Sequence, residues 1–140
     1  MKGTGKRIVD QIRTVVAELE GHEQTRLTQD TAALVRRGVG KLTVVSNNFQ
    51  GKRLLRPNDV IVKSDGSIYF TDPGGPLAPD QFDVTIAGVY RVSADLGSIS
   101  LIVDDLIGPN GLAFSPDESI LYVNDARRRI VRAYDLLPNG

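Results

Sequence analysis

Residues 57–72 read PNDVIVKSDGSIYFTD, and residues 109–125 read PNGLAFSPDESILYVND. The two stretches are copies of one unit, because Asn58 and Asn110 stand 52 residues apart and Asp65 and Asp117 keep the same separation. Each copy consists of short β-rich runs around an Asp-Gly-type turn. An internal repeat of this period and composition is the sequence signature of a β-propeller blade.

The apolar pattern on both sides of the repeat predicts further strands. The predicted strands cover residues 34–37, 42–45, 60–62, 68–71, 88–92, 98–103, 112–114, 120–123 and 130–134. Four of them lie between Asn58 and Asp105 and make one complete blade, whereas the second copy lacks its fourth strand. The sequence therefore predicts a mainly β chain of about two and a half four-stranded blades, too few to close a ring of typically 4 to 8.

The N-terminal region has a different pattern. Its apolar residues recur at helical spacing, which predicts a helix over residues 6–20 with one apolar stripe. We divide the chain into an N-terminal helical segment and linker, residues 1–31, and an incomplete β-propeller, residues 32–140. The stripe favours packing against the β-region, and the alternative is a helix that binds a partner or a membrane surface.

Composition narrows the class of protein. The chain contains 41% hydrophobic residues, no cysteine, one histidine, and 17 basic residues that balance 17 acidic ones. This balance predicts no nucleic-acid partner, and a single histidine leaves no material for a Ser-His-Asp triad or an imidazole-rich metal site. Neither a signal peptide nor a transmembrane run is visible, so we expect a cytoplasmic chain without a membrane partner.

Four aspartates repeat between the copies, and each has a structural interpretation. Asp65 and Asp117 occupy turns and are interpreted as turn formers. Asp72 and Asp125, at the end of the second strand of each copy, are expected to cap backbone amides. None of the four is assigned to catalysis. The basic run of residues 127–129 is interpreted as a solvated loop, and the Pro- and Gly-rich stretch 73–80 as a connector rather than a substrate-entry lid.

The repeated asparagines are the candidate site. Asn58 and Asn110 each precede the innermost strand of a blade, and equivalent positions of successive blades converge on the central channel. A side-chain amide oxygen is a hard, neutral ligand suited to calcium or magnesium. Asparagine after proline also commonly caps a turn, and the residues alone leave the two interpretations equally weighted.

Four motifs together resemble the gluconolactonase and senescence-marker-protein (regucalcin) family. They begin at residues 56, 65, 88 and 109, and the resemblance extends over residues 51–139. The combination of Pro-Asn-Asp with Pro-Asn-Gly-Leu-Ala-Phe-Ser-Pro-Asp about fifty residues later is its most specific part. The resemblance implies a six-bladed propeller that holds one divalent metal ion in its channel and opens lactone or related ester bonds.

The resemblance also implies roles for three residues. Asn110 matches a metal-binding asparagine of the family, and Asn58 matches the asparagine beside the metal, a ligand in some members and a substrate contact in others. Arg56 stands where some relatives keep a substrate-binding arginine. The implied ion is Ca2+ first, with Zn2+, Mg2+ or Mn2+ as alternatives. The carboxylate ligands of the family are not found in this chain, and its catalytic residue stays unknown.

These observations predict a metal-dependent hydrolase of the lactonase type that acts on sugar-acid lactones or related esters. We expect its activity to be impaired in a truncated chain, because two neutral amides without carboxylate partners hold a divalent ion weakly. The alternative is a non-catalytic propeller segment that acts in assembly or in weak calcium binding. Such a segment would self-associate through the open edges of its blades.

Overall fold

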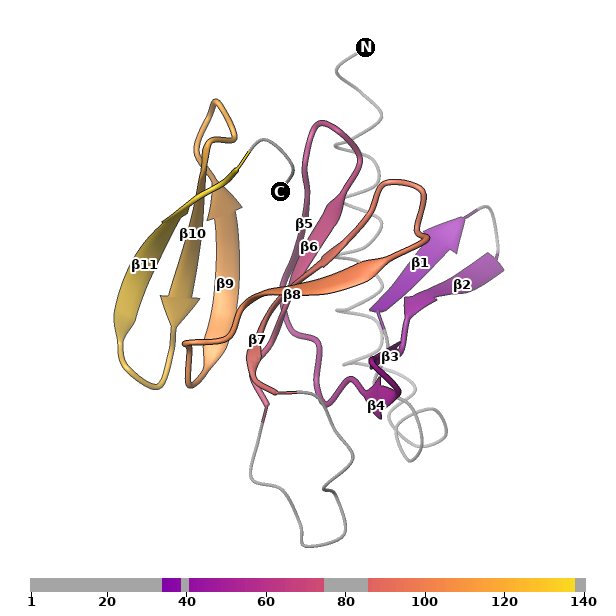
Figure 1. The fold of residues 1–140 in the computed structure, drawn as a ribbon, viewed down its shortest axis with the longest axis horizontal. Helices are drawn as coiled ribbons and strands as arrows, with labels where there is room; N and C mark the ends of the chain where they lie inside the picture. Colours follow the sequence, from indigo (N-terminus) through magenta and orange to yellow (C-terminus); the bar gives the residue numbers. More distant parts are fainter. Residues whose placement is uncertain (1–33, 39–40, 75–85, 138–140) are drawn as a thin grey trace, which may run out of the picture.

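The computed structural model describes residues 34–38, 41–74 and 86–137 (Figure 1). The predicted helix over residues 6–20, the division at residue 31 and most of the 73–80 connector lie outside these described residues.

All secondary structure in the described ranges is β, and every pairing is antiparallel. The strands are β1 (Leu34–Gly38), β2 (Lys41–Ser46), β3 (Asn48–Phe49), β4 (Lys52–Arg53), β5 (Val60–Val62), β6 (Ile68–Asp72), β7 (Gly88–Val92), β8 (Ile99–Val103), β9 (Pro109–Phe114), β10 (Ile120–Asp125) and β11 (Ile130–Asp135). All nine predicted strands are confirmed, two of them with the same bounds and the others within three residues at their ends. The short pair β3 and β4 was not predicted.

Strands β5 to β8 form a four-stranded sheet in sequence order, which we call the first blade. Figure 1 shows it between the β1–β2 hairpin and the β9–β11 sheet. Both faces of this sheet are covered, and all five residues of β6 are buried. Strands that are covered on both faces are typically continuous apolar runs, as the strands of this sheet nearly are. One face packs in a core that contains Leu54, Phe70 and Tyr90, with Val45 and Phe49 against it.

Strands β9, β10 and β11 form the second blade, with β10 in the middle of the sheet. Strand β10 alternates strictly, because Leu121 and Val123 are buried whereas Tyr122 and Asn124 are exposed. The buried side faces the first blade, and β9 contacts both β5 and β6. The side chains between the blades form one core, in which the ring of Tyr69 meets the ring of Phe114 edge-on at 5.0 Å between centroids.

The same turn recurs three times at the ends of the strand pairs. Asp65, Asp95 and Asp117 each accept a hydrogen bond from the backbone N–H two residues later, at 2.8, 3.0 and 3.2 Å. The residue after each aspartate has positive φ: Gly66 at 92°, Leu96 at 62° and Glu118 at 57°. The turn-forming role predicted for Asp65 and Asp117 is therefore confirmed, and Asp95 adds a third case.

The blades are also joined at their turns. The carboxylate of Glu118 accepts hydrogen bonds from the backbone N–H of Ser64 at 2.9 Å and from its hydroxyl at 2.5 Å. This contact links the β9–β10 turn of the second blade to the β5–β6 turn of the first. The two sheets are therefore joined at these turns as well as through their shared core.

Candidate functional site

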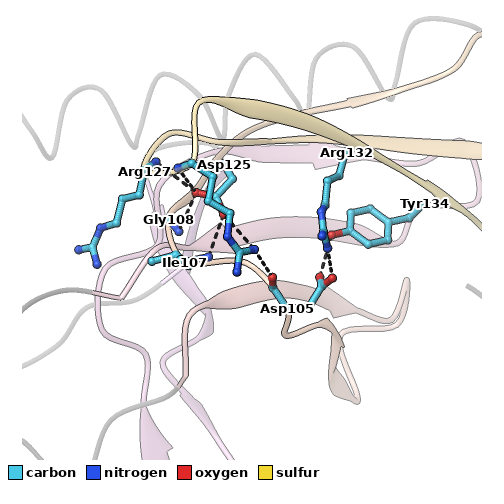
Figure 2. A network of polar contacts seen from close by, with 8 residues as sticks. Asp105, Ile107, Gly108, Asp125, Arg127, Arg132 and Tyr134 are labelled. Carbon is cyan, nitrogen blue, oxygen red and sulfur yellow. Dashed lines mark hydrogen bonds and ion pairs between the residues drawn. The ribbon is translucent and has the colours of Figure 1, made fainter.

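Asp72 and Asp125 are fully buried and have the same structural role in successive blades. Asp72 accepts hydrogen bonds from the backbone N–H groups of Leu55 and Arg56, at 2.7 and 3.0 Å. Asp125 does the same for Ile107 and Gly108, at 2.9 and 3.1 Å (Figure 2). Each carboxylate thus holds the chain segment that leads into the first strand of its own blade, β5 or β9, which confirms the predicted capping role.

Asp125 also binds the loop that follows it. It accepts hydrogen bonds from the N–H groups of Arg127 and Arg128, at 3.1 and 3.0 Å. Burial alone would raise the pKa of Asp125, but these donors, with those of Ile107 and Gly108, outweigh it and hold the pKa below its ordinary value. Because these donors stabilise the carboxylate anion, Asp125 is a weaker base than an ordinary aspartate, and its side chain is fully buried, so we do not assign it as a general base.

The basic run of residues 127–129 is exposed, as expected for a solvated loop. Within this run, Arg128 donates a hydrogen bond from Nη1 to the carbonyl of Asp105 at 2.5 Å. The side chain of Asp105 in turn forms an ion pair with Arg132 and accepts a hydrogen bond from the hydroxyl of Tyr134 at 2.8 Å (Figure 2). This polar network fastens the β8–β9 connection to the second blade.

The structure brings the segments of Asn58 and Asn110 together at the junction of the two blades. The N–H of Asn58 donates to the carbonyl of Thr71 at 2.9 Å, and the hydroxyl of Thr71 donates to the carbonyl of Asn110 at 2.7 Å. Asp59, next to Asn58, accepts the N–H of Leu112 at 2.8 Å. The convergence predicted from the repeat is confirmed for the backbone, and the ligand role of the asparagines stays a prediction.

Within the ranges that the structure describes, the side chains of the three predicted site residues have no polar partner. Asn58 is half-buried, and Asn110 and Arg56 are exposed. No residue in the described ranges forms a hydrogen bond or ion pair with any of these three side chains. In particular, neither asparagine accepts a backbone N–H there, as turn capping would require. None of the described residues therefore occupies the polar groups of these three side chains.

The side-chain oxygens of Asn58 and Asn110 are the type of ligand atom that a hard divalent cation prefers. Two amide oxygens suit Ca2+ or Mg2+, which take oxygen ligands and usually include carboxylates. The neighbouring carboxylate of Asp59 is already used by the N–H groups of Val60, at 2.9 Å, and Leu112. Among the described residues no group of three or more His, Cys, Asp or Glu side chains could hold a metal ion. The charged ligands of such a site would thus come from outside these residues.

Sequence reasoning missed Thr71 and Asp59, although the repeat contained a signal for one of them. Thr71 and Asn124 are equivalent in the two copies, with the offset of Asp72 and Asp125, and both have a side-chain oxygen. These oxygens have the same role in the structure, since Thr71 accepts the N–H of Asp59 at 3.0 Å and Asn124 accepts the N–H of Gly111 at 2.7 Å.

In the described part of the chain, no helix has the length and apolar character needed to cross a membrane.

Comparison with known proteins identifies the protein family of this chain. The family model described as SMP-30/Gluconolactonase/LRE-like region matches residues 9–140. A gluconolactonase of Zymomonas mobilis is 42% identical over 104 residues, which are 70% of this chain and 29% of that protein.

Two solved structures are similar in both fold and sequence. A crystal structure of a protein proposed to be a gluconolactonase aligns with a TM-score of 0.67 and 30% identity, over 77% of this chain and 39% of that one. A gluconolactonase from Xanthomonas campestris aligns with a TM-score of 0.63 and 36% identity, over 74% of this chain and 37% of that one. The chain therefore spans less than two fifths of the length of each of these relatives.

Proposed function

The chain belongs to the SMP-30/gluconolactonase/LRE-like family, and from this premise we propose that it is part of a metal-dependent lactonase that hydrolyses sugar-acid lactones or related esters. We further propose that its sheets are about two and a half blades of a six-bladed propeller, the fold that the family resemblance implies. The proposed metal ion is Ca2+, with Zn2+, Mg2+ or Mn2+ as alternatives, and its proposed ligands in this chain are Asn110 and Asn58.

One observation carries this proposal. Asn58 and Asn110 lie on segments that are hydrogen-bonded to each other through Thr71, while their side-chain amides have no partner among the described residues. Polar side chains that lie on adjoining segments and have no partner among the described residues are typical of a binding site rather than of a structural cap. The gluconolactonases to which the chain is similar supply the reaction class and the lactone substrate.

Each residue of the site has a chemical role in this proposal. Asn110 and Asn58 would hold the cation through their amide oxygens, and Arg56 would bind a hydroxyl or acid group of the sugar and so orient the lactone. When bound, the cation supplies Lewis acidity toward the lactone carbonyl and toward a water molecule. We assign the proton acceptor to none of the four repeated aspartates, since Asp65, Asp72, Asp117 and Asp125 are all engaged in backbone hydrogen bonds.

We expect the chain alone to bind Ca2+ weakly and to hydrolyse lactones slowly, because two neutral amides supply no charge to offset the desolvation of a divalent ion. Calorimetric titration with Ca2+ and hydrolysis of gluconolactone with and without chelator test the proposal. Asn110→Ala should abolish the binding and the metal-dependent rate. Asn48→Ala, an exposed asparagine on β3, is the matched control and should change neither. Hydrolysis that is indifferent to chelator and to Asn110→Ala would contradict the proposed activity.

A specific observation favours the alternative, assembly through an open blade. Tyr122 in the second blade is the equivalent of Tyr69 in the first. The outer face of the second blade therefore corresponds to the face of the first blade that the second blade covers. Tyr69 is fully buried under the second blade, whereas Tyr122 is 39% exposed. A second copy of this chain could cover this face as the second blade covers the first, gaining about 25 cal/mol for each Å2 of apolar surface buried.

Light scattering separates this alternative from the enzyme. If assembly occurs through this face, the wild type should have at least twice the mass of a monomer, and Tyr122→Glu should reduce it to one chain. Ile107→Lys, which places a charge at an exposed apolar residue of the β8–β9 connection, should leave the mass unchanged. A well-folded wild-type monomer at high concentration would exclude assembly by this route.

A further inference from the structure

We propose that Thr71 and Asp59 are positioning residues that hold Asn58 and Asn110 at a set separation for metal binding. The inference rests on the proposed metal site and extends it to two residues that would touch neither metal nor substrate.

A chain of hydrogen bonds through Thr71 and Asp59 connects the two asparagine segments. Thr71 accepts the N–H of Asp59 at 3.0 Å and donates its hydroxyl proton to the carbonyl of Asn110 at 2.7 Å. The carboxylate of Asp59 accepts the N–H of Leu112 at 2.8 Å. The backbone of Asn110 is thus tied to the first blade through its own carbonyl and through the amide two residues later. Asn58 is tied to the same threonine, because its N–H donates to the carbonyl of Thr71 at 2.9 Å.

The Thr71 side chain is held rigidly. Thr71 is fully buried, its β-branched side chain has few rotamers, and its hydroxyl is used both as acceptor and as donor. Hydrogen bonds in such a buried network are stronger than in water, and an unpaired member would be costly. The hydroxyl therefore allows little variation in the separation of the Asn58 and Asn110 segments.

The second blade has one of these two hydrogen-bonding groups but lacks the other. In the second blade Asn124 replaces Thr71 and still accepts the equivalent N–H, that of Gly111, at 2.7 Å. Gly111, however, occupies the position of Asp59 and has no carboxylate. The blade itself therefore needs the acceptor of Thr71 but not the carboxylate of Asp59. That carboxylate is found at the one described junction where two candidate metal-binding asparagines meet.

The two proposed ligands are weak, because both are neutral amides. Two neutral amides gain affinity for a cation chiefly if their oxygens are held in advance at the right separation. Loss of a partner that orients a metal ligand typically reduces metal affinity by about 10- to 100-fold. We therefore expect removal of the Thr71 hydroxyl to weaken Ca2+ binding by about tenfold or more.

The test compares three variants of the full chain with one control. Thr71→Val keeps the shape of the side chain and removes the hydroxyl, Thr71→Ser restores a hydroxyl, and Asp59→Asn leaves one oxygen for two N–H donors. Ser115→Ala is the control, since it removes hydrogen bonds with Asp117 and Ile120 in the turn of the second blade. Ca2+ affinity is measured by calorimetry, and protection of the Leu112 amide by hydrogen exchange, with thermal unfolding to verify that each variant is folded.

The expected result is a Ca2+ affinity about tenfold or more lower in Thr71→Val and in Asp59→Asn, faster exchange at Leu112 in Asp59→Asn, and near wild-type values in Thr71→Ser and Ser115→Ala. If Thr71→Val does not fold, the comparison of Asp59→Asn with Ser115→Ala tests the positioning role.

Asn110→Ala distinguishes failure of the positioning role from failure of the proposed metal site. Loss of binding in Asn110→Ala with wild-type binding in Thr71→Val and Asp59→Asn would overturn the positioning role and leave the metal site intact. Wild-type binding in Asn110→Ala would overturn the metal site and the positioning role with it.

Discussion

The ring of Tyr69 in the first blade meets the ring of Phe114 in the second edge-on, with centroids 5.0 Å apart and planes at 88°. Tyr69 is fully buried, and the guanidinium carbon of Arg91 lies 5.9 Å from the centroid of its ring. Edge-to-face contacts of this kind add about 0.5–1.5 kcal/mol to the burial of the rings. This pair is therefore a central element of the packing between the blades.

The hydroxyl of Tyr69 is buried without a hydrogen-bond partner in the described part of the chain. A buried hydroxyl that has lost its water and gained no partner is destabilising. Tyr69→Phe should therefore raise the free energy of unfolding by about 1 kcal/mol, measured by urea denaturation. The matched control is Tyr122→Phe, the exposed equivalent in the second blade, which should have no effect. A loss of stability in Tyr69→Phe would contradict the prediction.

The carboxylate of Asp125 should be among the most important single groups for stability. It is fully buried and accepts hydrogen bonds from four backbone N–H groups, those of Ile107, Gly108, Arg127 and Arg128. Asp125→Ala should lower the free energy of unfolding by about 3 kcal/mol, because it leaves several of these donors unpaired. The exposed Asp104→Ala is the control for chemical denaturation. Equal effects of the two substitutions would show that the N–H groups are not held by Asp125.

Asp117 should contribute to the pH dependence of stability. Hydrogen bonds from the hydroxyls of Ser115 and Ser119 and from the N–H of Ser119 lower its pKa from 3.8 to about 2. Because the folded state has the lower pKa, the stabilisation is complete above the ordinary value and is lost as the pH falls from about 4 toward 2.

The measurement is the difference in the free energy of unfolding between wild type and Asp117→Asn as a function of pH. We expect this difference to be constant near neutral pH and to shrink below about pH 4. Subtracting the variant removes the contributions of the other aspartates with lowered pKa. A difference that is independent of pH down to about 2 would refute the assigned shift.

Arg129 has φ of 58°, in the left-handed region that favours glycine. Its side chain is exposed, so little packing is lost when it is removed. Arg129→Gly should raise the midpoint of thermal unfolding, with a gain of about 0.5–1 kcal/mol after the added chain entropy of glycine is counted. Arg127→Gly, at a residue without positive φ in the same loop, should instead be destabilising. A gain in both variants would mean that backbone strain is not the cause.

Local sequence was sufficient for the strands and turns. The apolar runs that became β6, β7 and β10 and the turns at Asp65 and Asp117 depend on interactions between near neighbours, which the residue pattern records. The pair β3 and β4 was missed because two-residue strands carry no periodic signal.

The sequence by itself determined the repeat, and with it the family, the convergence of the Asn58 and Asn110 segments and the capping role of Asp72 and Asp125. Only the tertiary structure decided how the segments are joined, because the hydrogen bond from Thr71 to the carbonyl of Asn110 spans 39 residues. A hydroxyl at the end of a strand can bind any nearby carbonyl, and its partner is set by the packing of one blade against the next. The spacing of residues along the chain cannot specify that packing.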